Sequence, residues 1–236
     1  MSDDEAIEYS ETELLEEESG ERAAEAPRAV DGLVPGVVIE GRYEILDVVG
    51  EGGMGRVFKA EDMTLHEMVA LKTLNVETAE NPDAVRQFHR EVKLARRVAH
   101  PHVIRTYDIG TTDAYPFLTM EYLQGEDLRR AIRAGEMSAS EVVSTAGDIA
   151  DGLAAAHEVG VLHRDLKPEN VLIGEAGRVA LTDFGIAGAV RSGDGRETIR
   201  QQAVGTPAYM APEQVRGDTD MDQRVDIYAF GILLFE

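Results

Sequence analysis

Residues 163–170 bring together side chains that are suited to phosphoryl transfer. The stretch reads His-Arg-Asp-Leu-Lys-Pro-Glu-Asn, which predicts a loop between a helix and a short strand. The carboxylate of Asp165 can orient a hydroxyl group and accept its proton. The ammonium of Lys167 can neutralise charge on a moving phosphoryl group, and the carboxamide oxygen of Asn170 can bind a metal ion. A lone Asp would more often be a turn residue, but the complete string favours a catalytic loop.

A second string, Asp183-Phe184-Gly185, follows 13 residues after Asn170. Asp183 supplies another metal-binding carboxylate, and Gly185 supplies a flexible position next to it. The two strings match the protein-kinase patterns H-R-D-L-x-x-x-N and D-F-G. The sequence therefore resembles a bacterial eukaryotic-like (Hanks-type) serine/threonine protein kinase.

This resemblance implies an α+β, bilobal, protein kinase-like fold. The N-lobe, residues 41–122, would be an antiparallel sheet plus one helix, and the C-lobe, residues 123–236, would be mostly helical. In the family, the residue equivalent to Asp226 anchors the backbone of the catalytic loop. Kinase domains continue through several more helices after this point, so we expect an incomplete C-lobe and a C-terminally truncated chain.

A glycine-rich stretch at residues 50–55 has the pattern G-x-G-x-x-G. The same pattern marks dinucleotide-binding turns, in which the glycines open a helix. Here the strand-like residues 56–60 follow, so we predict a β-hairpin whose glycines let the backbone approach a triphosphate. The resemblance implies ATP contacts from this hairpin and the next strand: Val49, Gly50, Glu51, Gly52, Gly53, Met54, Gly55, Val57 and Ala70.

Lys72 lies in a predicted strand at residues 67–74 and ends a Val-Ala-Leu-Lys string that matches the family pattern V-A-I-K. A single lysine in a strand would more often be solvated, but its place after the hairpin favours binding of the nucleotide phosphates. The next helix begins at Asn81 and Pro82, which suit the N-cap and the first helical position. Glu91, at the edge of the helix's apolar stripe, matches the family glutamate that pairs with Lys72. The stripe consists of Val85, Phe88, Val92 and Ala95.

The linker between the two predicted lobes follows a strand that ends near Leu123. By resemblance, Met120 is the gatekeeper residue, and the backbones of Glu121 and Leu123 form hydrogen bonds with adenine. The ribose contact would come from Asp127 or from the neighbouring Glu126.

The predicted C-lobe opens with a capping box at residues 138–141, which begins a helix that extends to about Glu158. Short strands at residues 171–173 and 179–182 flank the catalytic loop and Asp183. By resemblance, Leu172 forms the floor under the adenine ring. The buried face of the helix would consist of Ala146, Ile149, Leu153 and Ala156.

Residues 186–204 are polar and contain glycine, which is typical of a mobile loop. Thr206 belongs to a segment that matches the family's substrate-binding region, and together with the catalytic-loop lysine it indicates Ser/Thr specificity. In the family, the arginine at position Arg164 pairs with a phosphate on this loop. Ser192 and Thr198 are therefore candidate regulatory phosphorylation sites. The alternative is that Thr198 is an ordinary exposed loop residue.

We therefore expect an ATP-dependent protein serine/threonine kinase, with Mg²⁺ held by Asn170 and Asp183 and the phosphates oriented by Lys72, which Glu91 fixes. The implied partners are ATP, proteins that bear Ser or Thr, and a second copy of the chain for autophosphorylation. One alternative is an inactive fragment or pseudokinase-like nucleotide-binding module. Another is a small-molecule kinase of the aminoglycoside type, which the peptide-binding segment at residues 205–213 disfavours.

The distribution of charge narrows the classes of partner. The net charge is −22, and residues 1–40, with 13 acidic and 2 basic side chains, carry half of it. We predict that this segment is a disordered acidic tail, either solubilising or used for docking. The acidic balance disfavours binding to nucleic acid or to an anionic membrane.

The remaining composition bears on the compartment of the protein. There is no cysteine, so disulfides and thiolate metal sites are excluded. No run of 18 apolar residues predicts a membrane span, and the acidic N-terminus does not have the apolar core of a secretory signal. These features favour a cytoplasmic location.

Overall fold

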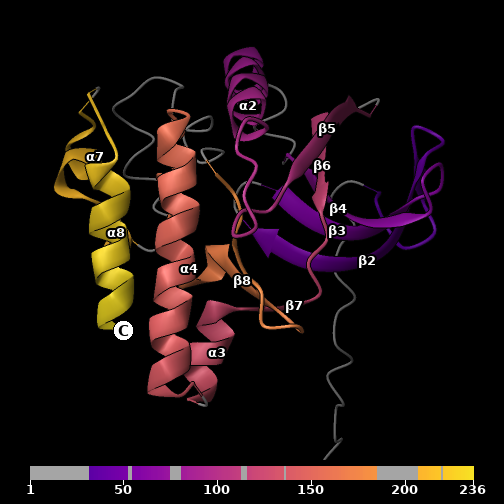
Figure 1. Cartoon of the computed structure of the whole chain (residues 1–236). Coiled ribbons are helices and arrows are strands. Elements are labelled where there is room, and N and C mark those ends of the chain that lie inside the picture. Colours follow the sequence, from indigo (N-terminus) through magenta and orange to yellow (C-terminus); the bar gives the residue numbers. More distant parts are fainter. Residues whose placement is uncertain are drawn as a thin grey trace, which may run out of the picture. The chain divides into compact units, whose positions relative to one another are not determined.

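The computed structural model describes residues 32–52, 55–74, 81–112, 116–135, 137–184, 207–218 and 220–236. All of them lie within one unit, Asp31–Glu236. In this unit a large antiparallel sheet and helix α2 come first in the chain, and a mostly helical part with a small sheet follows (Figure 1). The bilobal α+β architecture expected from the sequence is confirmed.

Six strands of the described residues form the N-lobe sheet in the order β1-β2-β3-β4-β6-β5, and all neighbours are antiparallel. The bounds are β1 Val38–Ile39, β2 Tyr43–Gly52, β3 Gly55–Asp62, β4 Glu67–Thr73, β5 Thr106–Thr111 and β6 Pro116–Glu121. The residues just before β5 contact the C-lobe, since the Ile104 N–H donates to the Leu181 carbonyl at 2.8 Å.

The glycine-rich stretch forms the hairpin between β2 and β3, where Gly52 pairs with Gly55. Gly55 has a φ of +145°, and a Cβ at this position would lie 1.8 Å from the Thr73 carbonyl oxygen. Only glycine fits such a position. The hairpin prediction is therefore confirmed, and the helix-opening turn of dinucleotide sites is excluded.

The folded region begins before residue 41. β1 pairs with β2, and Leu33 and Ile39 are buried in the same cluster as Tyr43 and Phe58. The predicted boundary between a disordered tail at 1–40 and a domain at 41–236 is therefore corrected, because residues 33–39 contribute to the core of the sheet. These apolar residues lie in a stretch rich in Pro and Gly, and this composition led to the prediction of disorder.

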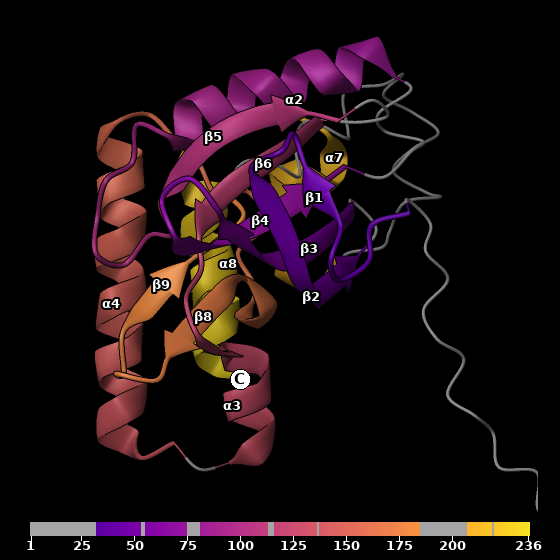
Figure 2. The same cartoon turned by 90° about the vertical axis from the view of Figure 1, so that its right-hand side faces the viewer.

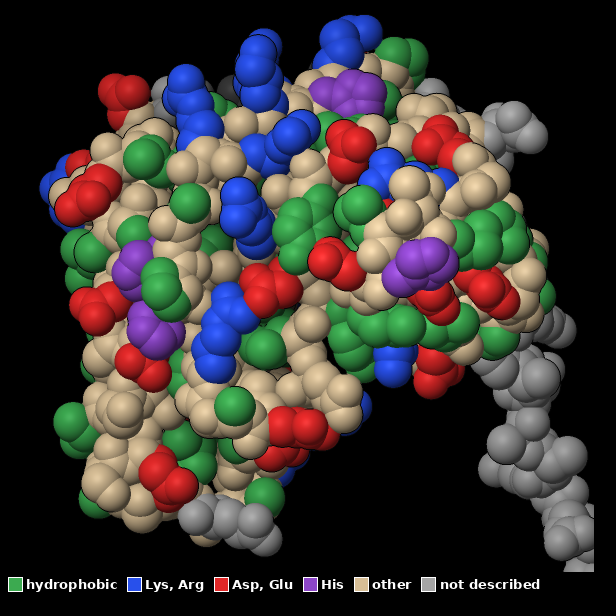
Figure 3. Space-filling model, turned by 45° about the vertical axis from the view of Figure 1, so that its right-hand side comes forward, with side chains coloured by type: hydrophobic (Ala, Val, Ile, Leu, Met, Phe, Trp, Pro, Cys, Tyr) green, Lys and Arg blue, Asp and Glu red, His purple; other side chains and the backbone are tan. Residues whose placement is uncertain are grey.

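Helix α2, Pro82–Ala95, lies along β5 (Figure 2). The Asp83 N–H donates to Asn81 Oδ1 at 2.9 Å, which confirms the predicted N-cap. Phe88 and Val92 are buried, as the apolar stripe predicted. Basic side chains gather over the outer side of this helix (Figure 3). The exposed ones are Arg86, Arg90 and Lys93 of the helix, and Arg96 and Arg97 directly after it.

Within the described residues, the C-lobe contains a three-stranded sheet, β7-β8-β9, and helices α3, α4, α7 and α8. The bounds are β7 Gly125–Asp127, α3 Leu128–Ala134, α4 Ala139–Glu158, β8 Val171–Gly174, β9 Val179–Leu181, α7 Pro212–Arg216 and α8 Arg224–Phe235. The capping box at the start of α4 is present, as predicted. No helix in these ranges has both the length and the apolarity that a membrane crossing requires.

The C-lobe core lies where α4, β9 and α8 meet. It includes Ile149 and Leu153 of α4, Leu181 of β9, and Ala229 and Leu233 of α8. The loop at residues 99–105 joins this core to the N-lobe through a bridge between Val103 and Leu181. The two lobes are therefore linked behind the site as well as through the chain at residues 121–124, called the hinge below.

Candidate active site

Asp226 at the start of α8 anchors the catalytic loop. Its buried carboxylate accepts hydrogen bonds from the backbone N–H groups of His163 at 2.8 Å and Arg164 at 2.7 Å. Arg164 has a φ of +64°, a conformation that costs a non-glycine residue about 1 kcal/mol or more. The two bonds hold this strained backbone directly before Asp165, as expected of Asp226.

His157, in the last turn of α4, contributes to the same anchor. Its Nε2 lies 2.8 Å from Asp226 Oδ2. Burial alone would raise the pKa of Asp226, but the hydrogen bonds from His157 and from the loop N–H groups outweigh it and hold that pKa below its ordinary value. His157 was not among the predicted site residues, and its one signal in the sequence is its place at the end of the predicted helix.

Asp165, Lys167 and Asn170 lie together, as their spacing predicted. Lys167 Nζ is 2.8 Å from Asp165 Oδ2, and Asn170 Nδ2 donates to Asp165 Oδ2 at 3.1 Å and to the Asp165 carbonyl at 2.7 Å. The Asp165 carboxylate is thus fixed in direction by two side chains. Because Asn170 uses its amide nitrogen in these bonds, its oxygen is the atom suited to binding a metal.

Lys72 and Asp183 form an ion pair across the two lobes, with Nζ and Oδ1 2.7 Å apart. Lys72 is buried on β4, and Asp183 has a φ of +65° just after β9. Burial opposes ionisation of Asp183, but the adjacent ammonium dominates and holds the pKa of Asp183 below its ordinary value. An ionised carboxylate is therefore present where the sequence predicted a metal ligand.

Glu91 has different neighbours from those predicted. It is buried on α2, accepts a hydrogen bond from Gln87 Nε2 at 2.9 Å, and lies 3.7 Å from Arg164 Nη1. Among the described residues the ion-pair partner of Lys72 is Asp183, so the predicted Lys72–Glu91 pair is corrected for this structure. The ammonium of Lys72 is paired with Asp183, and the cation that lies near Glu91 is Arg164.

Five predicted adenine contacts lie in one hydrophobic cluster: Val57, Ala70, Met120, Leu123 and Leu172. They come from β3, β4, β6, the hinge and β8, and only the fold brings them together. Ala70 and Met120 are buried, while the other three are partly exposed and provide an apolar surface between the lobes.

The remaining predicted nucleotide contacts that the structure describes lie on β2 and at the start of α3. Gly50, Glu51 and Gly52 lie on β2 of the hairpin, and Val49 beside them is exposed. Asp127 is the N-cap of α3 and accepts the backbone N–H of Arg130 at 3.0 Å. The ribose contact of Asp127 stays a prediction, because this carboxylate already has a structural partner.

The sequence also matches a known protein family. The family model described as "Protein kinase domain" matches residues 43–236. The chain belongs to the protein kinase family.

Similar curated proteins include two bacterial kinases. This kinase is 40% identical over 206 residues to the probable serine/threonine-protein kinase pknA2 of Bifidobacterium longum, which covers 86% of this chain and 27% of the relative. It is also 40% identical over 205 residues to the serine/threonine-protein kinase PrkC of Bacillus subtilis, covering 86% and 31% of the two chains. The kinase chain thus spans about a third or less of the length of these relatives.

A solved structure gives the same fold. The crystal structure of the Mycobacterium tuberculosis PknI kinase domain superposes with a TM-score of 0.70 at 30% identity, covering 86% of this chain and 74% of that chain. The strand order and the lobes described above are therefore those of the kinase fold.

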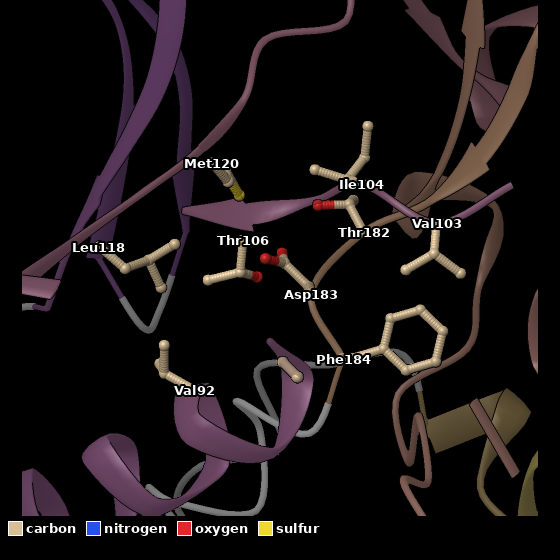
Figure 4. A pocket seen from close by; sticks show the side chains of 10 residues that line it. Val92, Val103, Ile104, Thr106, Leu118, Met120, Thr182, Asp183 and Phe184 are labelled. Carbon is tan, nitrogen blue, oxygen red and sulfur yellow. The ribbon is translucent and has the colours of Figure 1, made fainter. Parts of the chain in front are cut away.

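Beside Met120, the predicted gatekeeper, the kinase domain contains a cavity of about 20 Å³. It lies between Val92 of α2, Met120 of β6, and Asp183 and Phe184, and the Asp183 carboxylate points toward Thr106 (Figure 4). A space of this size is about that of one water molecule. α2 and the segment after β9 are therefore in close contact behind the site.

The donor set fits the metal that the kinase family implies. Asn170 offers an amide oxygen and Asp183 a carboxylate, both hard oxygen ligands of the kind that Mg²⁺ takes. The described residues contain no cluster of three His, Cys, Asp or Glu side chains around one point. Mg²⁺ usually takes one or two protein carboxylates and completes its shell with phosphate and water.

Several predicted site residues lie outside the described part of the kinase chain. These are Gly53, Met54, Gly185, Ser192, Thr198 and Thr206. Their predicted roles in nucleotide binding, regulation and substrate binding stay predictions. Arg164, the predicted partner of a phosphate on Thr198 or Ser192, is described, and its buried Nε has no hydrogen-bond partner among the described residues.

Proposed function

We propose that this chain is a serine/threonine protein kinase that transfers the γ-phosphoryl group of ATP to hydroxyl groups of proteins. The observation that carries the proposal is the arrangement around Asp165, whose Oδ2 is contacted by Lys167 Nζ and Asn170 Nδ2 on a loop anchored by Asp226. A carboxylate fixed in this way is suited to align a hydroxyl. The names of the relatives support the Ser/Thr specificity.

In the proposed reaction, Asp165 aligns the substrate hydroxyl and accepts its proton while the hydroxyl oxygen bonds to the γ-phosphorus. The bond between that phosphorus and the bridging oxygen of the β-phosphate breaks, and ADP leaves. Lys167 offsets charge on the transferred group, and Lys72 binds the phosphates. Mg²⁺ held by Asn170 and Asp183 would supply further positive charge. Rate enhancement then comes from positioning and electrostatic stabilisation.

The finer elements of the proposal rest on family membership. Adenine would lie against the cluster that contains Val57, Ala70 and Leu172, and the partial exposure of Val57 and Leu172 supports this. Arg164 would receive a regulatory phosphate, and its buried Nε, which has no partner in the described part of the chain, supports that role. We also propose that the protein acts in cytoplasmic signalling and that two copies phosphorylate each other.

The test compares the chain with its Asp165→Asn variant, using γ-labelled ATP, Mg²⁺ and a basic protein as acceptor. Label should pass to Ser or Thr of the acceptor with the unmodified chain and fall by several orders of magnitude in the variant. Asp218→Asn, an exposed carboxylate paired with Arg216, is the matched control and should retain activity. Binding of ATP without any transfer would favour the pseudokinase-like alternative, and an active Asp165→Asn variant would overturn the role of Asp165.

A further inference from the structure

Arg178, on the turn between β8 and β9, contacts the hinge from behind. Both terminal nitrogens of its guanidinium donate to the carboxylate of Glu121, Nη2 at 3.2 Å, and its Nε donates to the Pro101 carbonyl at 2.6 Å. A guanidinium that binds both oxygens of a carboxylate forms one of the strongest and most directional polar contacts in proteins. None of the roles assigned above involves Arg178.

Glu121 is held on three sides. Besides Arg178, its Oε2 accepts the Arg105 N–H at 3.3 Å, and its own N–H donates to the Arg105 carbonyl at 2.9 Å. Burial would raise the pKa of Glu121, but the hydrogen bonds and positive charges of Arg178 and Arg105 together outweigh it, and that pKa lies below its ordinary value. The carboxylate is therefore an ionised and fixed group rather than a solvated one.

The same turn also holds the far end of the hinge. Glu175 N–H donates to the Gln124 carbonyl at 3.0 Å, and Gln124 Nε2 donates to Glu175 Oε1 at 2.7 Å. A Cβ on Gly174 would lie 2.9 Å from a methyl carbon of Leu123, so the turn packs directly against the hinge. The pairing of β6 with β4 ends at Glu121. The hinge residues that follow are therefore restrained by the turn and not by strand pairing.

The turn itself is firmly based in the C-lobe. The Leu181 N–H donates to the His102 carbonyl at 2.9 Å, and His102 Nδ1 lies 2.8 Å from the Val179 carbonyl. Arg178 directly precedes Val179 and also binds Pro101, so β9 and the loop at 99–105 form one frame behind the hinge (Figure 2).

We propose that Arg178 is a positioning residue for the nucleotide. By binding the Glu121 carboxylate, Arg178 holds the backbone of residues 121–123, which belong to the hinge, in the conformation that binds adenine. The inference rests on the proposed function, since adenine at the hinge belongs to it. The physical reason is that a site fixed before binding loses less conformational freedom when the ligand arrives, so affinity falls when the support is removed.

The test uses the full chain with Arg178→Gln, Arg178→Lys, Glu121→Gln and the Arg178→Gln/Glu121→Gln pair. The Kd for ATP, the KM for ATP and kcat are measured. Arg178→Gln should raise Kd and KM about 5- to 10-fold, as for loss of a charged hydrogen bond, with kcat changed less than about twofold. Arg178→Lys should be intermediate, because an ammonium cannot reproduce the fork. The double variant should match Arg178→Gln, because both changes break one contact.

A second measurement separates this inference from the proposed function. Amide hydrogen exchange in peptides covering the hinge, without nucleotide, should be faster in Arg178→Gln than in the unmodified chain. Arg216→Gln, which breaks an exposed arginine–carboxylate pair elsewhere, should change neither exchange at the hinge nor ATP affinity. An unmodified chain that binds no ATP would overturn the proposed function and the nucleotide role of Arg178. Normal ATP binding with unchanged affinity or exchange in Arg178→Gln would overturn the positioning role of Arg178 alone.

Discussion

Lys72 Nζ lies 2.7 Å from Asp183 Oδ1, and this ion pair joins β4 of the N-lobe to the segment that follows β9. Glu91, the other carboxylate expected near Lys72, lies instead 3.7 Å from Arg164 of the catalytic loop. Two cations and two carboxylates, the buried Glu91 and the partly exposed Asp183, thus form two pairs, and each pair connects α2 or β4 to the catalytic machinery. The predictions below follow from these contacts and from the backbone that supports them.

Replacing Lys72 should remove most phosphoryl transfer and leave the fold intact. Lys72→Met keeps the apolar stem and removes the charge. The transferring phosphates are then less stabilised, and kcat should fall by about 10²- to 10³-fold. Steady-state transfer rates and thermal unfolding measure the two effects. Lys93→Met on the exposed side of α2 is the matched control and should behave like the unmodified chain. Transfer within a few-fold of normal in Lys72→Met would contradict the assignment.

Thr198 should become phosphorylated when the chain is incubated with ATP and Mg²⁺. A phosphate carries about −1.5 to −2 charges and can bind the guanidinium of Arg164 through two oxygens. Arg164 would then exchange its contact with Glu91 for one with the phosphate. Mass spectrometry should locate the phosphate at Thr198, with Ser192 as a secondary site, and Thr198→Ala should lower activity more than Ser192→Ala. Full activity with Thr198 unmodified would refute the switch.

Asp226 should make stability depend on acid pH. Its pKa is depressed in the folded chain, so its contribution to stability is complete above the ordinary carboxyl pKa of about 3.9 and is lost as the pH falls through the lower folded value. The free energy of unfolding of Asp226→Asn should therefore lie below that of the unmodified chain at neutral pH, and the gap should narrow below about pH 4. Urea unfolding across this range measures it. A gap that is constant with pH would show that the carboxylate charge contributes nothing.

Gly55→Ala should destabilise the chain more than Gly135→Ala. Both glycines have positive φ, but a Cβ at Gly55 would collide with the Thr73 carbonyl at 1.8 Å, whereas the space around Gly135 is open. We expect a loss of about 1 kcal/mol for Gly135→Ala and more than about 2 kcal/mol for Gly55→Ala. Denaturant unfolding of the two variants gives both numbers. Equal losses would mean that the hairpin shifts to make room.

Much of the fold and the site was predictable because the signals are local. The catalytic loop, the capping box of α4 and the glycine hairpin each depend on residues that are near one another in sequence, and the structure confirms their geometry. The short β7 and α3 were not predicted, since segments of this length give little periodic signal. Leu33 and Ile39 were assigned to the tail because composition, averaged over a window, hid two apolar residues that the sheet buries.

The sequence by itself determined which chemical groups this protein carries: the Asp165 loop, the Asp183 carboxylate, Lys72 and the glycines of the β2–β3 hairpin. Only the tertiary structure decided how the charged groups pair. The sequence predicted that Lys72 pairs with Glu91, but the fold places Asp183 nearer to it. Glu121 and Arg178 are 57 residues apart, and no pattern in the sequence links them. The physical reason is that the strength of an ion pair depends on separation and burial, and the packing of the two lobes sets both.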